Sequence, residues 1–372
     1  MTDNEALAWI RLQRIPGIGP INGRKLVQYF GDVRNIFNQS ARDLVQMAGV
    51  GPVMAERILN QTYRKDAENQ YRMILKDSVR CLPLTHNAYP ELLKECPDAP
   101  LILFQKGSLA FTGRRLLSIV GTRSMTDYGR SVCERLIKGL VPYNPVIVSG
   151  LAYGVDIFAQ RNALKWGLDT VSCLGHGLDT VYPGGHAKYV PEILDRGALL
   201  SEFGLGTPPE PMNFVRRNRI IAGLAPATVV IQSGSKGGSL ITADLAFGYD
   251  REVFAVPGRT TDCFSAGCNL LIGQHKAQLL HSPEQLVEAL DWAPAPLKSE
   301  IPTQKIWSQG QGVLTATEIR ICEFLSVNGI QLLDEIAVGC TLTTREVATV
   351  LFQMEMKEII RPYPGKRFEL AL

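Results

Sequence analysis

Short apolar runs alternate with amphipathic segments through the middle of the chain, from about residue 80 to residue 292. The runs are five or six residues long and rich in β-branched side chains, a pattern typical of strands that are buried on both faces of a parallel sheet. We expect strands at residues 116–120, 145–149, 170–174, 198–202, 227–232 and 252–256. Helical patterns, for example residues 127–140 and 154–167, lie between them. The alternation predicts a doubly wound α/β domain over residues 80–292.

Residues 1–75 show helical patterns only, and two of their segments resemble each other. Gly17-Ile18-Gly19 and Gly49-Val50-Gly51, offset by 32 positions, each stand between two helical patterns. This arrangement is typical of an all-α helix-hairpin-helix or SAM-like domain, whose glycine turns expose backbone N–H groups that can hold a phosphate. The same fold also serves for protein contacts alone, so both functions stay open.

The C-terminal part of the chain has a different pattern. Residues 293–312 are rich in proline, glycine and polar residues and predict a linker. Residues 313–372 show three helical patterns followed by a strand pair, which indicates a winged-helix domain. From Thr315 onward there are eight acidic and six basic residues, whereas a helix that reads duplex DNA should be basic. The charge balance favours protein contacts for this domain.

Composition narrows the class of protein. A chain of 372 residues exceeds the usual size of one domain, and its 45% apolar and 20% charged residues are typical of a soluble globular protein. The net charge is only +3, so any affinity for nucleic acid must come from local patches. The N-terminus has no secretory signal and no run of 18 apolar residues occurs, so we expect a cytoplasmic protein without membrane association.

Two segments without acidic residues, 99–126 and 211–243, carry clusters of cations. These cations are Lys106, Arg114, Arg115 and Arg123 in the first segment and Arg216, Arg217, Arg219 and Lys236 in the second. Both segments contain a predicted strand, and in an open parallel sheet the loops after the strands gather at the carboxyl edge, where ligands bind. We therefore expect Arg123, Arg219 and Lys236 to converge on one site.

The second segment also contains a glycine-rich loop that leads directly into a helical pattern. Gly234, Gly237, Gly238 and Ser239 follow an apolar run, which places free backbone N–H groups and the positive end of a helix together. This combination predicts an anion-binding loop. A tight strand-to-helix turn with a solvated basic face is the simpler alternative, and the first cationic segment makes it less plausible.

Catalytic and cofactor motifs are incomplete. No P-loop sequence occurs, and residues 175–180 match a dinucleotide fingerprint only in part. Ser149 lacks the nucleophile-elbow sequence, and Asp156 has no partner acid, so we assign Asp156 to the start of a helix. Cys263, Cys268 and His275 do not have zinc-site spacing. We expect no catalytic residues, no cofactor and no metal.

Eight ordered sequence blocks together resemble one known family. They are VGTR (120–123), SGLAYGVD (149–156), GHGLDTVYP (175–183), SEF (201–203), FVRRNRIIAGLA (214–225), SGSKGGSLITADLA (233–246), VFAVPG (253–258) and CNLLI (268–272). This combination resembles the DNA processing protein A family, also called DprA or Smf. The predicted domains on either side are similar to the three-part layout of that family.

The resemblance implies a fold, a function and a set of partners. It implies an extended Rossmann-like domain without nucleotide turnover, in a bacterial cytoplasmic protein that forms a homodimer. Such a protein binds and protects single-stranded DNA taken up in natural transformation and helps to load the RecA recombinase onto it. The residues point to the same ligand class, because a cationic edge with N–H donors suits the phosphates of a flexible strand.

The resemblance also points to residues that hold the strand. The family uses the arginine after the first strand and the lysine of the glycine loop, which correspond to Arg123 and Lys236 here. The complete set of expected DNA contacts is Gly121, Thr122, Arg123, Ser149, Gly150, Arg216, Arg217, Asn218, Arg219, Lys236, Gly237, Gly238 and Ser239. Phe214 or Tyr153 is placed to stack on bases.

One departure from the family pattern concerns the detailed contacts of the glycine loop and not its role, and other functions are considered beside it. Family members usually have an acid and Ala after the fifth strand and a single Gly after the next Ser, whereas this chain has Gln232-Ser233 and Gly237-Gly238. The alternative is a nucleoside monophosphate phosphoribohydrolase of a related Rossmann-like fold, which uses a PGG-type loop. Here Pro183-Gly184-Gly185 lacks the Gly-Thr and Glu that follow in that pattern. A third possibility is a protein adaptor built on the end domains alone.

Overall fold

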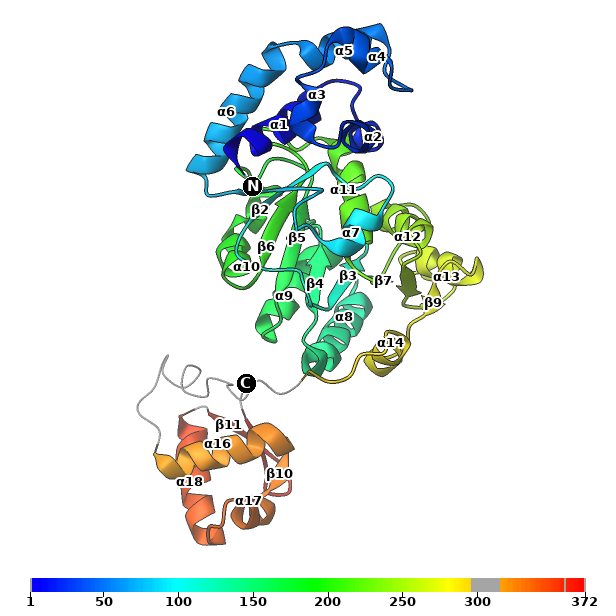
Figure 1. Ribbon diagram of the computed structural model, residues 1–372. Helices are drawn as coiled ribbons and strands as arrows, with labels where there is room; N and C mark the ends of the chain where they lie inside the picture. The colour runs from blue at the N-terminus through cyan, green and yellow to red at the C-terminus, as the bar shows by residue number, and fades with distance from the viewer. Residues whose placement is uncertain (1, 296–314, 358, 371–372) are drawn as a thin grey trace. The chain divides into compact units, whose positions relative to one another are not determined.

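The chain divides into two compact units, residues 1–295 and 296–372 (Figure 1). The computed structural model describes residues 2–295, 315–357 and 359–370. Of the predicted linker, residues 293–312, only residues 293–295 are described, and the rest lies outside the described residues. The helical segment and the α/β segment that the sequence distinguishes belong to the same unit.

The N-terminal segment is entirely helical, as predicted. Its helices are α1 (Asp3–Arg14), α2 (Pro20–Phe30), α3 (Val33–Ile36), α4 (Ala41–Val45), α5 (Pro52–Leu59) and α6 (Thr62–Lys76). The two glycine turns have the same geometry: Gly17 and Gly49 have positive φ, and Gly19 and Gly51 directly precede α2 and α5. Proline at the first position of both helices fits these starts, because its missing N–H has no partner there in any case.

A nine-stranded sheet forms the centre of the larger unit. Its strands are β1 (Arg80–Pro83), β2 (Ile102–Lys106), β3 (Leu116–Val120), β4 (Val146–Ser149), β5 (Thr170–Leu174), β6 (Ala198–Ser201), β7 (Ala227–Val230), β8 (Glu252–Ala255) and β9 (Gln278–Leu279). Their order is β1-β2-β6-β5-β4-β3-β7-β8-β9. All six predicted strands are present and parallel, and the sheet gains β9 at one edge and the antiparallel pair β1–β2 at the other.

Helices cover both faces of this sheet. The α/β part contains α7 (Glu91–Glu95), α8 (Asp127–Leu140), α9 (Val155–Lys165), α10 (Val190–Arg196), α11 (Pro211–Leu224), α12 (Gly238–Gly248), α13 (Ala266–Gly273) and α14 (Pro283–Ala289), with short 3-10 turns at Val141–Tyr143 and Gly184–Tyr189. Alternate side chains of each strand point to opposite faces. Thus Leu117 and Ile119 of β3 join the core under α8, α9 and α14, whereas Leu116 and Val120 join the core under α11 and α12.

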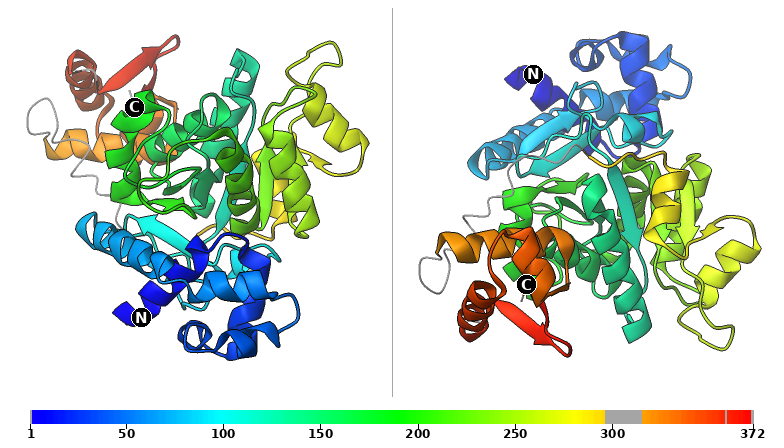
Figure 2. Two further views of the ribbon diagram at one scale, coloured as in Figure 1. Left: turned by 90° about the horizontal axis from the view of Figure 1, so that it is seen from above. Right: turned by 90° about the horizontal axis from the view of Figure 1, so that it is seen from below.

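The N-terminal helices share the second of these cores. Trp9 and Leu26 belong to the same continuous apolar cluster as Leu101 and Ile221. Helix α1 packs on β1 and β2, and Figures 1 and 2 show the blue helices beside these strands. Gly23 of α2 lies so close to Leu101 that a Cβ there would be 2.3 Å from its side chain. This shared core explains why residues 1–295 form one unit.

The chain reverses its direction of travel across the sheet at β3. From β3 it passes through β4 and β5 to β6 on one side, and then returns to build β7, β8 and β9 on the other side. The loops that follow β3 and β7 therefore leave the sheet in opposite directions, which opens a crevice at the carboxyl edge.

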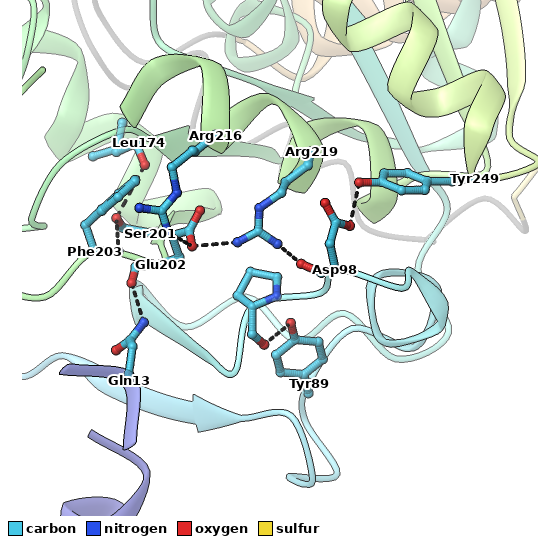
Figure 3. A network of polar contacts seen from close by, with 11 residues as sticks. Gln13, Tyr89, Asp98, Leu174, Ser201, Glu202, Phe203, Arg216, Arg219 and Tyr249 are labelled. Atoms are coloured by element: carbon cyan, nitrogen blue, oxygen red, sulfur yellow. Dashed lines mark hydrogen bonds and ion pairs between the residues drawn. The ribbon is translucent and has the colours of Figure 1, made fainter. Parts of the chain in front are cut away.

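A buried ionic network holds α11 against the sheet (Figure 3). Glu202 directly follows β6, and its Oε2 accepts hydrogen bonds from Arg219 at 2.5 Å and Arg216 at 3.1 Å. Arg219 also donates to the backbone oxygen of Asp98, whose carboxylate accepts from the Tyr249 hydroxyl at 2.6 Å. Gln13 of α1 donates to the backbone oxygen of Glu202 at 2.7 Å. The network joins α1, β6, α11, the segment before β2 and the end of α12.

The smaller unit contains three helices and a small antiparallel sheet. Its elements are α16 (Ala316–Asn328), β10 (Gln331–Leu332), α17 (Leu333–Gly339), α18 (Thr344–Met356), β11 (Ile360–Tyr363) and β12 (Arg367–Leu370), with strand order β10-β12-β11. The predicted helices and strand pair are present, and they are the elements that a winged helix requires. Lys357, directly after α18, pairs with Glu318 at 2.6 Å, which removes one of the few cations of the expected recognition helix.

The Glu202 network generates a prediction about stability. Replacing Glu202 with Ala leaves the Arg219 guanidinium buried without its partner, so the free energy of unfolding should fall by about 3 kcal/mol. The measurement is chemical denaturation of residues 1–295. The control is Glu68→Ala, which breaks the exposed Glu68–Arg64 pair of α6 and should cost less than about 0.5 kcal/mol. Equal losses in the two variants would contradict the structural role of the network.

Candidate functional site

A cavity of about 560 Å³ opens at the carboxyl edge of the sheet, where β3 and β7 diverge. The loops after β3, β4, β5 and β7 contribute to its wall, together with helices α11 and α12. On α11 the lining includes Phe214, Arg217, Asn218 and Ile221, which form one helical face because residues three and four positions apart lie next to each other. The cavity is where the crevice rule for open α/β sheets places a ligand.

Arg123 and Lys236 both line this cavity, although 113 positions separate them in the sequence. Arg123 belongs to the loop after β3, and Lys236 belongs to the loop between β7 and α12. Both side chains are exposed, and neither forms an ion pair or hydrogen bond with another residue that the structure describes. Two full positive charges are therefore available to a ligand in one place.

The glycine loop adds backbone donors to these charges. Helix α12 starts at Gly238, and Gly237 precedes it without any side-chain cap for the first N–H groups. Ser239 and Ser233 hydrogen bond to each other through their hydroxyl groups at 2.9 Å. Uncapped N–H groups and the positive end of the helix dipole favour an anion at this position.

The Arg123 loop and the glycine loop are fastened together by Gln232, which has no solvent exposure. Its Oε1 accepts from the Thr126 N–H at 3.1 Å, and its Nε2 donates to the Thr126 hydroxyl at 2.8 Å. Its backbone oxygen accepts from the Thr122 N–H at 2.7 Å. At Gly121 a Cβ would lie 2.5 Å from Val155 and 2.8 Å from the Gln232 oxygen. Gly121 and Thr122 thus set the position of Arg123 and also line the cavity.

Arg217 lines the cavity, but its donors are largely occupied by the protein. It is 4% exposed, and its Nη1 donates to the backbone oxygens of Gly150, at 2.7 Å, and Cys173. Burial lowers the pKa of Arg217, and the nearby Asp156 carboxylate opposes this shift. A Cβ on Gly150 would lie 2.5 Å from the guanidinium. Arg217 therefore binds the carbonyl groups at the ends of β4 and β5 and contributes charge to the cavity wall.

The structure does not bring Arg216 and Arg219 into the cavity. Both belong to the Glu202 network, and Arg219 is 7% exposed. They lie three positions apart on α11, on a different face from the stripe that begins at Phe214. Our expectation that Arg219 converges with Arg123 and Lys236 is therefore not met. Ser149 is fully buried and donates to the Ile119 oxygen at 2.7 Å, and it does not line the cavity either.

Most cations of the first acid-free segment lie at the opposite edge of the sheet. Arg114 and Arg115 precede β3, where Arg114 pairs with Asp169 at 2.6 Å and Arg115 donates to the Ala293 oxygen. Lys106 ends β2, but β2 is antiparallel and pairs Lys106 with Leu199 at the start of β6. The cations of this segment were expected to follow a strand at the carboxyl edge of the sheet, and of the four only Arg123 lies there.

Aromatic rings form one side of the cavity. Phe214 and Tyr182 both line it, with ring centroids 5.4 Å apart, and Tyr182 is 46% exposed. Phe214 or Tyr153 was predicted from the sequence to stack on bases, and Tyr182 was missed. Its position directly after the GHGLDTV stretch, in the loop after β5, was the available signal. Tyr153 is exposed and does not line the cavity.

Asp156 contributes the one carboxylate among the residues that line the cavity. It lies in the first turn of α9, as expected, and is 7% exposed. Burial raises the pKa of Asp156, and the Arg217 guanidinium together with the N–H groups of Ala152 and Gly150 opposes this shift. These interactions favour a role in holding the loop after β4.

The structure contains few groups that resemble a catalytic or metal centre. His176 and His186 are buried, and their Nδ1 atoms contact the backbone oxygens of Gly177 at 2.9 Å and Leu151 at 2.8 Å. Among the described residues, no group of three or more His, Cys, Asp or Glu side chains is arranged to hold a metal ion. Over the same residues, every helix is too short or too polar to span a bilayer.

Comparisons with known proteins agree with this architecture. A model described as DNA recombination-mediator protein A matches residues 80–291, and a SAM-like helix-hairpin-helix tandem matches residues 10–62. Protein Smf of Escherichia coli is 31% identical over 98% of this chain and 95% of its own length. DNA processing protein DprA of Streptococcus pneumoniae is 38% identical over 55% of this chain and 72% of its own length.

Solved structures give the same result. The X-ray structure of DNA processing protein A from Streptococcus pneumoniae is 30% identical, with a TM-score of 0.67, over 78% of this chain and 99% of that one. DNA processing protein A from Helicobacter pylori, described with a single-stranded DNA binding mode, is 30% identical with a TM-score of 0.53 over 58% of this chain and 97% of its own. The chain belongs to the DNA recombination-mediator protein A family.

Proposed function

We propose that this protein binds single-stranded DNA by its phosphates in the cavity at the carboxyl edge of the sheet. The observation that carries this proposal is the position of Arg123 and Lys236, two exposed cations without an acidic partner among the described residues, on the lining of one cavity. The uncapped start of α12 supplies N–H donors beside Lys236. Together they match the charge and the hydrogen-bonding capacity of a phosphodiester.

The aromatic wall favours a single strand over a duplex. Phe214 and Tyr182 line the same cavity as the two cations. A base can stack on these rings only when it is not stacked and paired inside a duplex. Phosphate contacts position a strand without reading its bases, so binding at this site should be largely independent of sequence. The Helicobacter pylori relative, which is described as binding single-stranded DNA, supports this ligand class.

Membership of the family supports the wider function. We propose that the bound strand is protected and passed to the RecA recombinase, as in DNA processing for natural transformation. We further propose that the protein works as a homodimer in the bacterial cytoplasm. The remaining expected contacts, Thr122, Asn218 and Ser239, line the cavity and belong to the same proposal.

A role as an enzyme has less support. The nucleoside monophosphate phosphoribohydrolase alternative requires residues after Pro183-Gly184-Gly185 that this chain does not have. Asp156 is the acid of the cavity, and its contacts hold a loop. We therefore propose a binding protein without nucleotide turnover.

The salt dependence of binding tests the phosphate contacts directly. For single strands, the slope of log affinity against log salt concentration is about −0.7 for each phosphate that the protein neutralises. Arg123→Ala and Lys236→Ala should therefore each make this slope shallower by about 0.7. Sequence preference should not change. Because both residues contact one short stretch of strand, the double variant should lose less than the sum of the single variants. The measurement is fluorescence anisotropy with labelled oligothymidylate.

The matched control for this experiment is Lys106→Ala. Lys106 belongs to the same acid-free segment as Arg123 but lies at the opposite edge of the sheet. The Lys106→Ala substitution should leave both the affinity for single-stranded DNA and its salt slope unchanged. Additive losses in the double variant, together with an unaltered slope, would show that neither Arg123 nor Lys236 meets a phosphate.

Removal of the smaller unit tests where the strand binds. Because Arg123, Lys236 and the shared core all lie within residues 1–295, a protein that ends at residue 295 should keep its affinity for single strands within about tenfold, or 1.4 kcal/mol. The fragment must include α1–α6, since these helices share the core of the sheet. A larger loss would assign the strand to residues 296–372.

Turnover assays test the enzyme alternative. The purified protein should release no product from ATP, NAD or nucleoside monophosphates, because its cavity offers no complete acid–base pair. Product analysis by chromatography is the measurement, with Arg123→Ala as the reference. Release by the natural protein above the level of this variant would restore the enzyme alternative.

A further inference from the structure

A second group of aromatic and cationic side chains lies beside the cavity. Tyr153 follows β4, Arg161 lies on α9, and His186, Lys188 and Tyr189 belong to the 3-10 turn Gly184–Tyr189. Tyr153 was predicted from the sequence to stack on bases, whereas Arg161, Lys188 and Tyr189 were not predicted to take part in binding. We call Tyr153, Arg161, Lys188 and Tyr189 the exit track.

The rings of this group form a continuous row. The Tyr153 and His186 ring centroids are 4.8 Å apart, and the His186 and Tyr189 centroids are 6.1 Å apart. His186 is buried and held by the Leu151 backbone oxygen at 2.8 Å, so the middle of the row is fixed. Tyr153 is 53% exposed and Tyr189 is half-buried, so both outer rings present surface to solvent.

Two cations accompany the outer ring. The Arg161 guanidinium carbon lies 4.9 Å from the Tyr189 ring centroid, and the Lys188 Nζ lies 5.1 Å from it. Both cations are exposed, and neither pairs with an acid in the described part of the chain. A stacked cation keeps its charge, so this end of the row combines ring surface with two unneutralised positive charges.

The exit track is continuous with the cavity. Ala152, the neighbour of Tyr153, lines the cavity, and so does Tyr182. Pro183-Gly184-Gly185 then connects Tyr182 directly to His186. Helices α9 and α10, which flank Arg161 and Tyr189, pack beside each other (Figure 1). The track therefore begins at Tyr153, next to a residue that lines the cavity.

From this arrangement we infer that single-stranded DNA extends from the cavity along the exit track. An unpaired base stacks on the exposed Tyr153 ring. Arg161 and Lys188, which the Tyr189 ring holds in place, neutralise phosphates farther along the strand. Alternating ring surfaces and positive charges are the features by which proteins hold single strands without reading their sequence. The inference rests on the proposed function and adds to it a second contact region, which only a longer strand can reach.

The test compares a short and a long oligothymidylate on the full chain. The probes have about 4 and about 16 nucleotides, the two ends of the range of site sizes that single-strand-binding folds show. We expect the short oligomer to be held by the cavity and the long one to reach the track as well. The variants are the double substitution Arg161→Ala with Lys188→Ala and, separately, Tyr189→Ala. We expect either variant to weaken binding of the long oligomer about tenfold or more and to change binding of the short one less than twofold. For the long oligomer, the double variant should also make the salt slope shallower by about 1.4, twice the value for one phosphate.

The chain offers a matched control at Trp166. Lys138 and Lys165 lie 5.0 and 5.2 Å from its ring, so they form the same kind of cation–ring group, and Lys165 is the last residue of α9. The double substitution Lys138→Ala with Lys165→Ala removes two exposed cations outside the track, of which Lys165 also pairs with Glu134 at 3.1 Å. It should leave the affinity for both oligomers unchanged. The two double variants should unfold at the same temperature. A difference in their affinity for DNA then comes from lost contacts with the strand and not from lost stability.

The outcomes separate the track from the cavity. In one outcome the track variants bind the long oligomer as well as the natural protein does, while Arg123→Ala weakens binding of both oligomers. This outcome contradicts the track as a DNA contact and leaves the cavity as the DNA site. Equal weakening of both oligomers by the track variants also overturns it, since the residues then act on the cavity itself. If the natural protein binds neither oligomer, the proposed function fails, and the track fails with it.

Discussion

The buried pairing of Glu202 with Arg219 is the interaction on which the candidate site depends. It fixes α11 to the end of β6 and, through Asp98 and Tyr249, to the segment before β2 and the end of α12 (Figure 3). With α11 fixed, its face from Phe214 to Ile221 forms one wall of the cavity. Burying two charges is costly unless they are paired, so the ion pair specifies one position for the helix.

The same interaction decides which cations can meet a ligand. Arg216 and Arg219 share the single carboxylate of Glu202, Arg217 donates to backbone oxygens, and Arg114 is paired with Asp169. A basic stretch of sequence is therefore not equivalent to a basic site. Most of the conspicuous arginines stabilise the fold, and the exposed Arg123 and Lys236 keep their charge available.

Much of the fold could be predicted from the sequence because local patterns determine it. The six apolar runs became parallel strands, and the two glycine turns became helix starts, since burial and turn geometry act over a few residues. The strands β1 and β2 were missed, because their antiparallel pairing at the sheet edge depends on contacts with β6, far away in sequence. Arg219 and Lys106 were misplaced for related reasons: helical phase and strand direction decide which way a side chain points.

Gln232, which follows β7, shows how a buried neutral side chain affects the site. Its amide both accepts from the Thr126 N–H and donates to the Thr126 hydroxyl. A carboxylate has acceptors only, and in a fully buried position it would add a negative charge beside the loop that carries Arg123. The neutral amide keeps the two loops joined without lowering the positive potential between Arg123 and Lys236. In this chain the loops that carry Arg123 and Lys236 are therefore joined through hydrogen bonds of a neutral residue, and the charge of the cavity is left to the side chains that line it.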